Sequence, residues 1–505
     1  MTTDAGLQLG GTTAPRTGST VVWLAAGILV CAVAVALRVA LPFNVDVSWL
    51  LIVCERVLDG QRLYLDILEI NPPMACAVYM VAVLLARLLG LRAELVTLVL
   101  VFCLIAASLA VTWRLLRGSR ISGRFAALPL AVWAVVLLAI LPMYDFGQRE
   151  QLALLFFLPA LAVLVRRANG NEISFGMVII AGIGAAITMC FKPYFALGVG
   201  AAIVASAVAA RQWRIVIAPE NWIAGVLVVA YAFWVYVAFP AYFTEIYPIA
   251  NDVYRLLTVS SLALALSGAT TLWLGAMLAI LVLQRQRSVD PTVVVLLAAS
   301  FGFAMSYFVQ SRGYGYHAYP MVALALMALG YAVATIDRAR PDARRLLMVS
   351  SVAALVLLVS ACVWFKASVD MRALQDAVTK LGLQRPKIIM LGGAATVAHP
   401  LVRNVDGVWV SRQEALSIRE IVRHARQNRT LDAATTARLD QYVATERDGL
   451  VEDIRKSSPD VVLIDDRDTD WSGWAKADPE LAALLKSYVW IQHANGVDIL
   501  LKTVP

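Results

Sequence analysis

The feature that most constrains this chain is a series of long apolar runs. One of them, which starts at Leu262, reads LALALSGATTLWLGAMLAILVL. A bilayer core takes about 20 apolar residues per helix, and buried helices of soluble proteins are rarely apolar for so long. Only 15% of the 505 residues are charged, whereas soluble domains carry about 25%. We therefore predict a polytopic α-helical membrane protein.

The apolar runs predict about eleven transmembrane helices. The first run, Val21 to Ala40, is too long for the apolar part of a signal peptide and lacks a small-residue cleavage site, so we expect it to be retained. The expected spans are 21–41, 94–113, 125–142, 151–165, 175–191, 194–210, 221–239, 258–283, 291–309, 319–336 and 346–364.

Arginines in the connecting loops predict the orientation. Alternate loops are rich in arginine, and such loops stay in the cytoplasm. Residues 1–20 are then a cytoplasmic tail. The net charge of +8 is explained by topology, and no nucleic-acid partner is expected. The cytoplasmic set is Arg114, Arg117, Arg120, Arg124, Arg166, Arg167, Arg211, Arg214, Arg285, Arg287, Arg338, Arg340, Arg344 and Arg345.

The segment from Met74 to Leu89 is apolar enough for another span, but counting it would invert every later loop. Pro72 and Pro73 precede it and Arg87 interrupts it, which is typical of a helix at the membrane surface. We therefore expect a transmembrane domain over 21–365 with a large first periplasmic loop at 42–93.

The region 366–505 has a different character. Three short apolar segments, KIIMLGG (387–393), DVVLIDD (460–466) and VDILLK (497–502), alternate with polar helical stretches such as 430–454. Strands that alternate with helices predict a small α/β domain, here on the periplasmic side.

Charged residues near the predicted outer face are the candidates for chemistry, because burying them beside lipid is costly. Asp46 follows the first span almost at once. It is either catalytic or the N-cap of an amphipathic helix that lies on the membrane, carries Trp49 and Val53 on its apolar side and ends at Gly60. The second outer loop, LPMYDFGQREQL, adds Asp145, Gln148, Arg149 and Glu150.

Two further outer segments carry cations and aromatic residues. FKPYF places Lys192 where a span reaches the outside. Arginine and lysine form charge-assisted bonds to phosphate oxygens, and a carboxylate beside them suits a general base. The segment QSRGYGYHAYP contributes Gln310, Arg312, Tyr314, Tyr316 and His317.

The acidic residue after the first span, followed by DGQRLYLDILEINPP, resembles the GT-C superfamily of membrane glycosyltransferases. Protein O-mannosyltransferases and the aminoarabinose transferases of lipid A belong to it. The resemblance implies that Asp46 and Asp145 match the catalytic acids of the first and second outer loops. Some members have Lys-Pro-Pro where this chain has Asn71 and two prolines, and that lysine contacts the donor phosphate. Another cation must then take this role here, and Lys192, Arg149 and Arg312 are the candidates.

The same resemblance implies an inverting glycosyltransferase at the periplasmic face of a bacterial inner membrane. The donor is a polyprenyl-phosphate sugar, and the acceptor is an envelope lipid, polysaccharide or protein. Asp46 deprotonates the acceptor hydroxyl, and Asp145 either positions the acceptor or binds a metal. A divalent metal stays an open question, because no ligand set of diagnostic spacing is visible. The candidates for binding the donor phosphate and substrates are Lys192, Arg149, Arg312, His317, Glu150, Tyr314 and Asn71.

Three other functions remain as alternatives. A transporter or flippase tends to place ionisable residues near the bilayer midplane and to contain paired repeats, whereas the charges here cluster at one face. A polymerase or ligase of lipid-linked glycans would carry its catalytic residues in a long late loop, whereas the long loop here comes first. In a non-catalytic scaffold, Asp46 would be inert.

Overall fold

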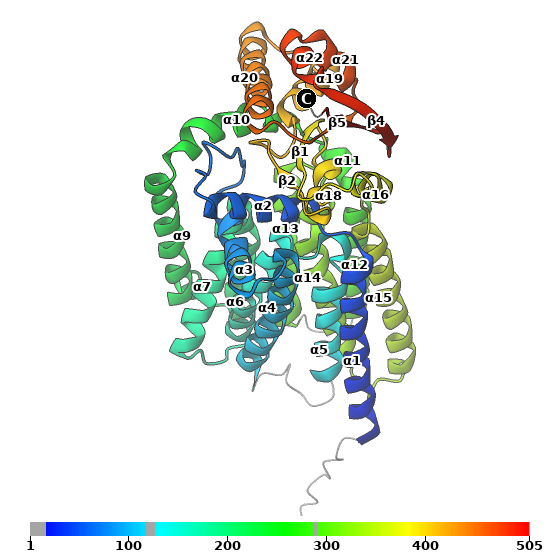
Figure 1. Cartoon of the computed structure of the whole chain (residues 1–505). Coiled ribbons are helices and arrows are strands. Elements are labelled where there is room, and N and C mark those ends of the chain that lie inside the picture. The colour runs from blue at the N-terminus through cyan, green and yellow to red at the C-terminus, as the bar shows by residue number, and fades with distance from the viewer. Residues whose placement is uncertain (1–16, 118–126, 286–289, 504–505) are drawn as a thin grey trace, which may run out of the picture.

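The computed structural model describes residues 17–117, 127–285 and 290–503. It consists of a helical bundle with a small sheet domain on one end (Figure 1). Residues 1–16 of the predicted tail lie outside the described residues, as do Arg120, Arg124 and Arg287 of the arginine-rich loops.

The bundle is built from helices α1 to α15. Their bounds are Thr17–Ala40 (α1), Val45–Leu58 (α2), Met74–Leu89 (α3), Ala93–Leu116 (α4), Ala127–Val135 (α5), Arg149–Ala168 (α6), Phe175–Phe191 (α7), Ala196–Ala210 (α8), Pro219–Ala238 (α9), Tyr247–Asp252 (α10), Ser261–Ala265 (α11), Gly268–Gln284 (α12), Pro291–Gln310 (α13), Tyr319–Ala334 (α14) and Ala343–Phe365 (α15).

Within the described ranges, eight helical segments are long and apolar enough to cross a membrane. Three further expected spans are shorter apolar helices, Ala127–Ile140, Phe175–Phe191 and Gly268–Gln284. The number of eleven crossings therefore stays a prediction. The eight long segments are Thr20–Ala40, Ala93–Leu116, Arg149–Ala168, Pro193–Ala210, Trp213–Ala238, Pro291–Gln310, Gly315–Ala334 and Ala343–Phe365.

The span expected at 258–283 is not continuous. Helix α11 ends at Ala265 and α12 begins at Gly268. The hydroxyls of Ser260 and Ser267 each accept a hydrogen bond from a backbone N–H of the helix that follows. Such caps define helix starts, so two short helices replace the long one.

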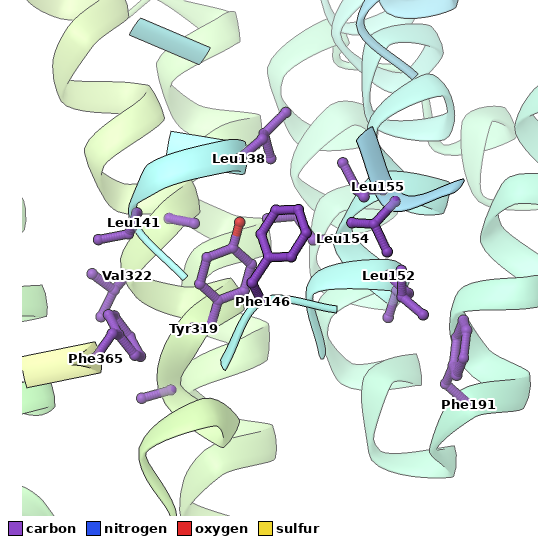
Figure 2. Close-up of a cluster of buried hydrophobic side chains, with 14 of the residues drawn as sticks. Leu138, Leu141, Phe146, Leu152, Leu154, Leu155, Phe191, Tyr319, Val322 and Phe365 are labelled. Carbon is purple, nitrogen blue, oxygen red and sulfur yellow. The ribbon is translucent and has the colours of Figure 1, made fainter. Parts of the chain in front are cut away.

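Small residues let the central helices approach closely. A Cβ on Gly302 of α13 would lie 2.3 Å from the carbonyl oxygen of Leu197 and 2.7 Å from Cα of Gly198, where α8 packs. Close backbone approach of this kind is common between transmembrane helices. Phe146, in the loop between α5 and α6, and Tyr319 of α14 belong to the same buried apolar core (Figure 2). This core holds that loop in place, and Tyr319 Oη donates to the carbonyl oxygen of Leu137 at 2.9 Å.

The first loop contains helices α2 and α3. Helix α2 is buried along Val47–Cys54, on all its sides, because the sheet domain covers the face that the bundle leaves open. The prediction of an amphipathic helix lying on the membrane is therefore wrong for α2. Helix α3 packs against α2 and α4, and Arg87 Nη2 donates to Asp59 Oδ1 at 2.9 Å. Its place at the membrane surface stays a prediction.

The sheet domain follows α15. Its five strands have the order β2-β1-β3-β5-β4, with β1 parallel to β2 and β3, and β5 antiparallel to β3 and β4. The bounds are Arg372–Thr379 (α16), Lys387–Leu391 (β1), Ala395–Ala398 (α17), Leu401–Asn404 (α18), Val408–Trp409 (β2), Ser417–Asn428 (α19), Ala433–Ser457 (α20), Val461–Asp465 (β3), Trp471–Ala477 (α21), Pro479–Leu485 (α22), Tyr488–Ala494 (β4) and Val497–Lys502 (β5).

The prediction of a small α/β domain is confirmed. The three apolar segments form β1, β3 and β5, and the polar stretch at 430–454 forms α20, which Asp432 caps. The sequence did not reveal β2, which has only two residues, or β4, whose residues are mostly exposed.

The sheet domain is attached to the first loop and to the segment before α11. Leu68 N donates to the carbonyl oxygen of Arg412 at 2.7 Å, and Arg56 Nη1 donates to that of Ser411 at 2.5 Å. Val253, in the segment before α11, packs with apolar residues of α19 and α20 in a separate buried cluster. The sheet domain therefore covers α2 (Figure 1).

Candidate functional site

The start of α2 separates two possible roles of Asp46. Asn44 is the N-cap: its Oδ1 accepts hydrogen bonds from the backbone N–H groups of Asp46, at 3.0 Å, and of Val47, at 3.3 Å. A side-chain oxygen at this position satisfies helix donors that otherwise lack partners. The alternative in which Asp46 itself caps the helix is therefore wrong, and its carboxylate is left for other contacts.

The Asp46 carboxylate faces the start of α6. Gln148 Nε2 and Arg149 Nη2 both donate to Asp46 Oδ2, at 2.9 and 3.3 Å. Gln148 Nε2 also donates to Asn44 Oδ1 at 2.9 Å. The Asp46 side chain is 24% exposed, whereas that of Glu150 is 0% exposed. Asp46 is thus both fixed by donors and reachable by a substrate.

Asp145 lies beside this group in a 3-10 turn, Met143–Asp145. Asn44 Nδ2 donates to Asp145 Oδ1 at 3.4 Å, and Arg38 Nη1 on α1 donates to the carbonyl oxygen of Met143 at 2.6 Å. Burial, followed by the charges of Asp46 and Glu150, raises the pKa of Asp145 well above its usual value. The charged form of Asp145 is therefore disfavoured at this position.

A second group of charged residues continues from Arg149. Lys192 Nζ donates to Glu150 Oε1 at 2.6 Å and lies 2.9 Å from His317 Nε2. Lys192 Nζ also lies 5.5 Å from the centre of the Tyr316 ring. Residues from α6, from the end of α7 and from the turn before α14, Gly315–Ala318, thus meet at one point.

The hydrogen bonds of this second group leave several polar atoms without partners. A lysine ammonium only donates, so His317 Nε2 accepts and the imidazole carries its proton on Nδ1. Among the described residues, His317 Nδ1, Arg149 Nε and Glu150 Oε2 are buried and lack any hydrogen-bond partner. Buried polar groups are nearly always paired, so these three atoms have capacity for further hydrogen bonds.

The remaining predicted residues lie at the border of this site. Arg312 Nη1 donates to the carbonyl oxygen of Tyr254. The Tyr314 ring stacks on Tyr316, with 5.7 Å between the ring centres. Asn71 Nδ2 donates to a buried carboxylate, Glu69 Oε1, at 2.5 Å.

The sequence did not single out Asn44, Glu69 or Glu414 as site residues. Asn44 stands two positions before Asp46, and helix-start preferences offered a signal for its cap role. Glu69 accepts from Trp49 Nε1 at 2.6 Å and is buried, which raises its pKa. Glu414 belongs to the sheet domain, and nothing in the sequence pairs it with the first loop. No group of three or more potential metal ligands occurs among the described residues.

Comparison with known proteins places the fold. No family model and no curated protein matches the chain. Two solved structures of ArnT from Cupriavidus metallidurans, one bound to undecaprenyl phosphate and one in the apo state, are similar to it with a TM-score of 0.59. Each is 14% identical in sequence, and the match covers 96% of this chain and 98% of the ArnT chain. The chain therefore has an ArnT-like fold, which agrees with the fold that the resemblance implied.

Proposed function

We propose that the protein is an inverting glycosyltransferase that moves a sugar from a polyprenyl-phosphate donor to an envelope lipid, polysaccharide or protein. One observation carries this proposal: Asp46 is paired with the buried cation Arg149, and the next residue, Glu150, is paired with Lys192, at one end of the bundle. A phosphate-binding part and a base are therefore adjacent. The ArnT-like fold, with undecaprenyl phosphate bound in one of the two ArnT structures, supports a lipid-linked donor.

Lys192 and Arg149 bind the donor phosphate. Both are nearly buried, with side chains 13% and 5% exposed, and charge-assisted bonds to phosphate are strong where water is excluded. His317 Nδ1 and Arg149 Nε supply two donors without protein partners. Asn71 does not replace the lysine of related sequences, because its amide is held by Glu69.

Asp46 acts as general base. It accepts the proton of an acceptor hydroxyl, whose oxygen attacks the anomeric carbon from the side opposite the phosphate. The bond between the anomeric carbon and the phosphate oxygen breaks, and polyprenyl phosphate leaves with its charge held by Lys192 and Arg149. Asp145, which lies beside Asp46 and shares Asn44 as a neighbour, positions the acceptor.

The arginine-rich ends of the helices support a periplasmic site in the inner membrane. Helix α6 has Arg149 at the site and Arg166 and Arg167 at its other end. Arg166 Nη1 donates there to the carbonyl oxygens of Leu115 and Arg117, so the basic ends of α4 and α6 meet away from the site. By the positive-inside rule that end is cytoplasmic.

Glycan analysis of cells tests the proposal. Cells that carry the wild type, Asp46→Asn or Asp145→Asn at matched protein levels are compared, with Asp59→Asn as a control. Asp59 belongs to the same loop and its side chain is 62% exposed. We expect Asp46→Asn to lose one envelope glycan modification and the control to keep it. If both site variants leave every envelope glycan unchanged, the transferase is excluded and a transporter, polymerase or scaffold takes its place.

A further inference from the structure

A groove lies where the segment before α11 meets the sheet domain. One wall comes from the end of α10 and the 3-10 turn Tyr254–Leu256, and the other from the first turns of α20 and the residue after α19. Its volume is about 330 Å³, which is the size of a site for a small ligand or a head group. Apart from one carboxylate, its polar lining residues are Asn251, Arg255, Thr258, Arg429, Thr435 and Arg438.

The groove carries an excess of positive charge. Arg255 comes from the segment before α11, whereas Arg429 and Arg438 come from the sheet domain. The one carboxylate of the lining, Asp252, lies with Oδ2 3.7 Å from Arg438 Nε and accepts a hydrogen bond from Tyr442 Oη at 3.2 Å. A single carboxylate does not balance three guanidinium groups, so like charges from two parts of the chain repel each other across the groove. A bound anion would offset this repulsion.

The arginines differ in how many donors the protein itself occupies. Arg429 Nη2 donates to the carbonyl oxygen of Leu256 at 3.0 Å and to Thr258 Oγ1 at 2.7 Å, so this side chain joins the two walls. The Arg255 side chain, in contrast, is exposed and forms no hydrogen bond or ion pair with any other described residue. Arginine presents five N–H donors in a fork that fits phosphate oxygens. All five donors of Arg255 are therefore available to an anion.

The groove lies at the level of the lipid head groups. Helix α9 belongs to an apolar segment that ends at Ala238. Arg167 Nη2, at the basic end of α6, donates to Glu220 Oε2 at the start of α9, so Ala238 lies toward the end of the bundle that carries the site. Tyr236 and Tyr247 beside that end are 66% and 57% exposed, and exposed aromatic rings are typical of the boundary between lipid chains and head groups. Helix α10, which begins at Tyr247, therefore brings the groove to this boundary.

We infer that this groove binds the phosphate group of an anionic phospholipid, which bridges Arg255 to Arg438 of the sheet domain. Basic pockets beside transmembrane helices bind anionic head groups, and the charge and the level of this groove favour a lipid over a soluble anion. The bound lipid offsets the repulsion among the arginines and so keeps the sheet domain on the segment before α11. This inference goes beyond the proposed function, because it requires no sugar transfer.

Lipid binding to the purified full-length protein tests the inference. Native mass spectrometry measures the affinity for phosphatidylglycerol, with phosphatidylcholine as the zwitterionic comparison, and hydrogen exchange locates the bound lipid. We expect phosphatidylglycerol to bind more tightly than phosphatidylcholine and to slow exchange in residues 251–258 and 429–439. In Arg255→Gln the affinity for phosphatidylglycerol should fall about fivefold, the share of one cation at a lipid surface. Because Arg255 has no partner among the described residues, this variant should fold like the wild type.

Two further variants and a competitor complete the test. Asp252→Asn removes the negative charge of the lining and should raise the affinity for phosphatidylglycerol, a direction that damage to the fold does not produce. Arg455→Gln, on the same helix as Arg438 and with a side chain 55% exposed against 56%, should bind like the wild type. Wild-type affinity in Arg255→Gln, or an equal loss in Arg455→Gln, overturns the inference. Displacement of the lipid by an equal concentration of inorganic phosphate also overturns it, in favour of a soluble anion. The assay contains no sugar, so its outcome is independent of the proposed transferase.

Discussion

Arg403 of the sheet domain and Glu55 of α2 form a double hydrogen bond, with Nη1 2.8 Å from Oε2 and Nη2 2.9 Å from Oε1. Arg403 Nε also donates to Glu94 Oε1 at 2.7 Å. The Arg403 side chain is only 9% exposed. Paired, planar contacts of arginine with a carboxylate fix orientation as well as distance. This contact therefore fixes the position and orientation of the sheet domain on the first loop.

Replacing Arg403 by alanine should loosen the sheet domain. Removal of one partner from a buried ion pair typically costs about 3–5 kcal/mol, because the other charge is left unpaired. We expect hydrogen exchange of the backbone amides in 44–70 and 408–416 to accelerate strongly in Arg403→Ala. Arg372→Ala, at a side chain 86% exposed, is the control and should exchange like the wild type. Equal exchange in both variants would show that the Arg403 contact does not keep the sheet domain attached to the first loop.

Binding of the donor phosphate should depend on Lys192 and not on Arg312. Lysine removal alone would leave Glu150 buried and unpaired, so the informative variant is Lys192→Met combined with Glu150→Gln. We expect its affinity for undecaprenyl phosphate to fall at least about tenfold, the range of a charge-assisted hydrogen bond. Arg312→Met should change this affinity little, since Arg312 binds the carbonyl oxygen of Tyr254. Native mass spectrometry measures both affinities for undecaprenyl phosphate. A larger loss of affinity in Arg312→Met than in the double variant would assign the phosphate site to Arg312 instead.

His399 should make the stability of the sheet domain sensitive to acid. It is buried between Trp49 and Trp409, with 5.5 and 5.0 Å between ring centres, and burial lowers its pKa to about 3. An unfolded chain binds a proton at this histidine below about pH 6.5 and the folded one does not. The stability from neutral His399 is therefore complete above pH 6.5 and declines as the pH falls toward 3.

The comparison variant for this prediction is His399→Phe. Phenylalanine keeps an aromatic ring between Trp49 and Trp409, and it removes the titration together with the interaction between the imidazole and the Glu414 backbone. Between pH 7 and pH 5 the wild type should lose about 2 kcal/mol of stability relative to His399→Phe. Buried carboxyl groups with raised pKa, such as Glu69 and Glu414, act in the opposite direction, but equally in both proteins. Parallel thermal unfolding curves across this pH range would contradict the prediction.

Two glycines of the bundle should respond differently to a methyl group. Gly302→Ala places Cβ against the backbone of α8 and should destabilise the protein by about 1–3 kcal/mol, as overpacking does. Gly200→Ala, on α8 itself, meets nothing within 4 Å and should be neutral or slightly stabilising. Unfolding temperatures in detergent measure both. Equal temperatures would mean that α8 and α13 separate at little cost.

The sequence predicted those features that depend on residues close together in the chain. The length of the apolar runs predicted the helical bundle, and short apolar segments that alternate with polar stretches predicted β1, β3 and β5. The charged residues of the outer loops placed Asp46, Arg149, Lys192 and His317 at one face. The sequence did not indicate the burial of α2 on both sides, because that burial comes from residues about 350 positions later in the chain.

The Arg403–Glu55 contact also has a consequence for biosynthesis. Its two residues are 348 positions apart, and at about 5–20 residues per second the ribosome takes on the order of 20–70 s to pass from one to the other. Asp46 is made before that interval and Arg149 and Lys192 during its first half, while the residues of the sheet domain that cover Trp49, such as Trp409, do not yet exist. Each new molecule thus makes its charged centre before the sheet domain that covers α2 exists.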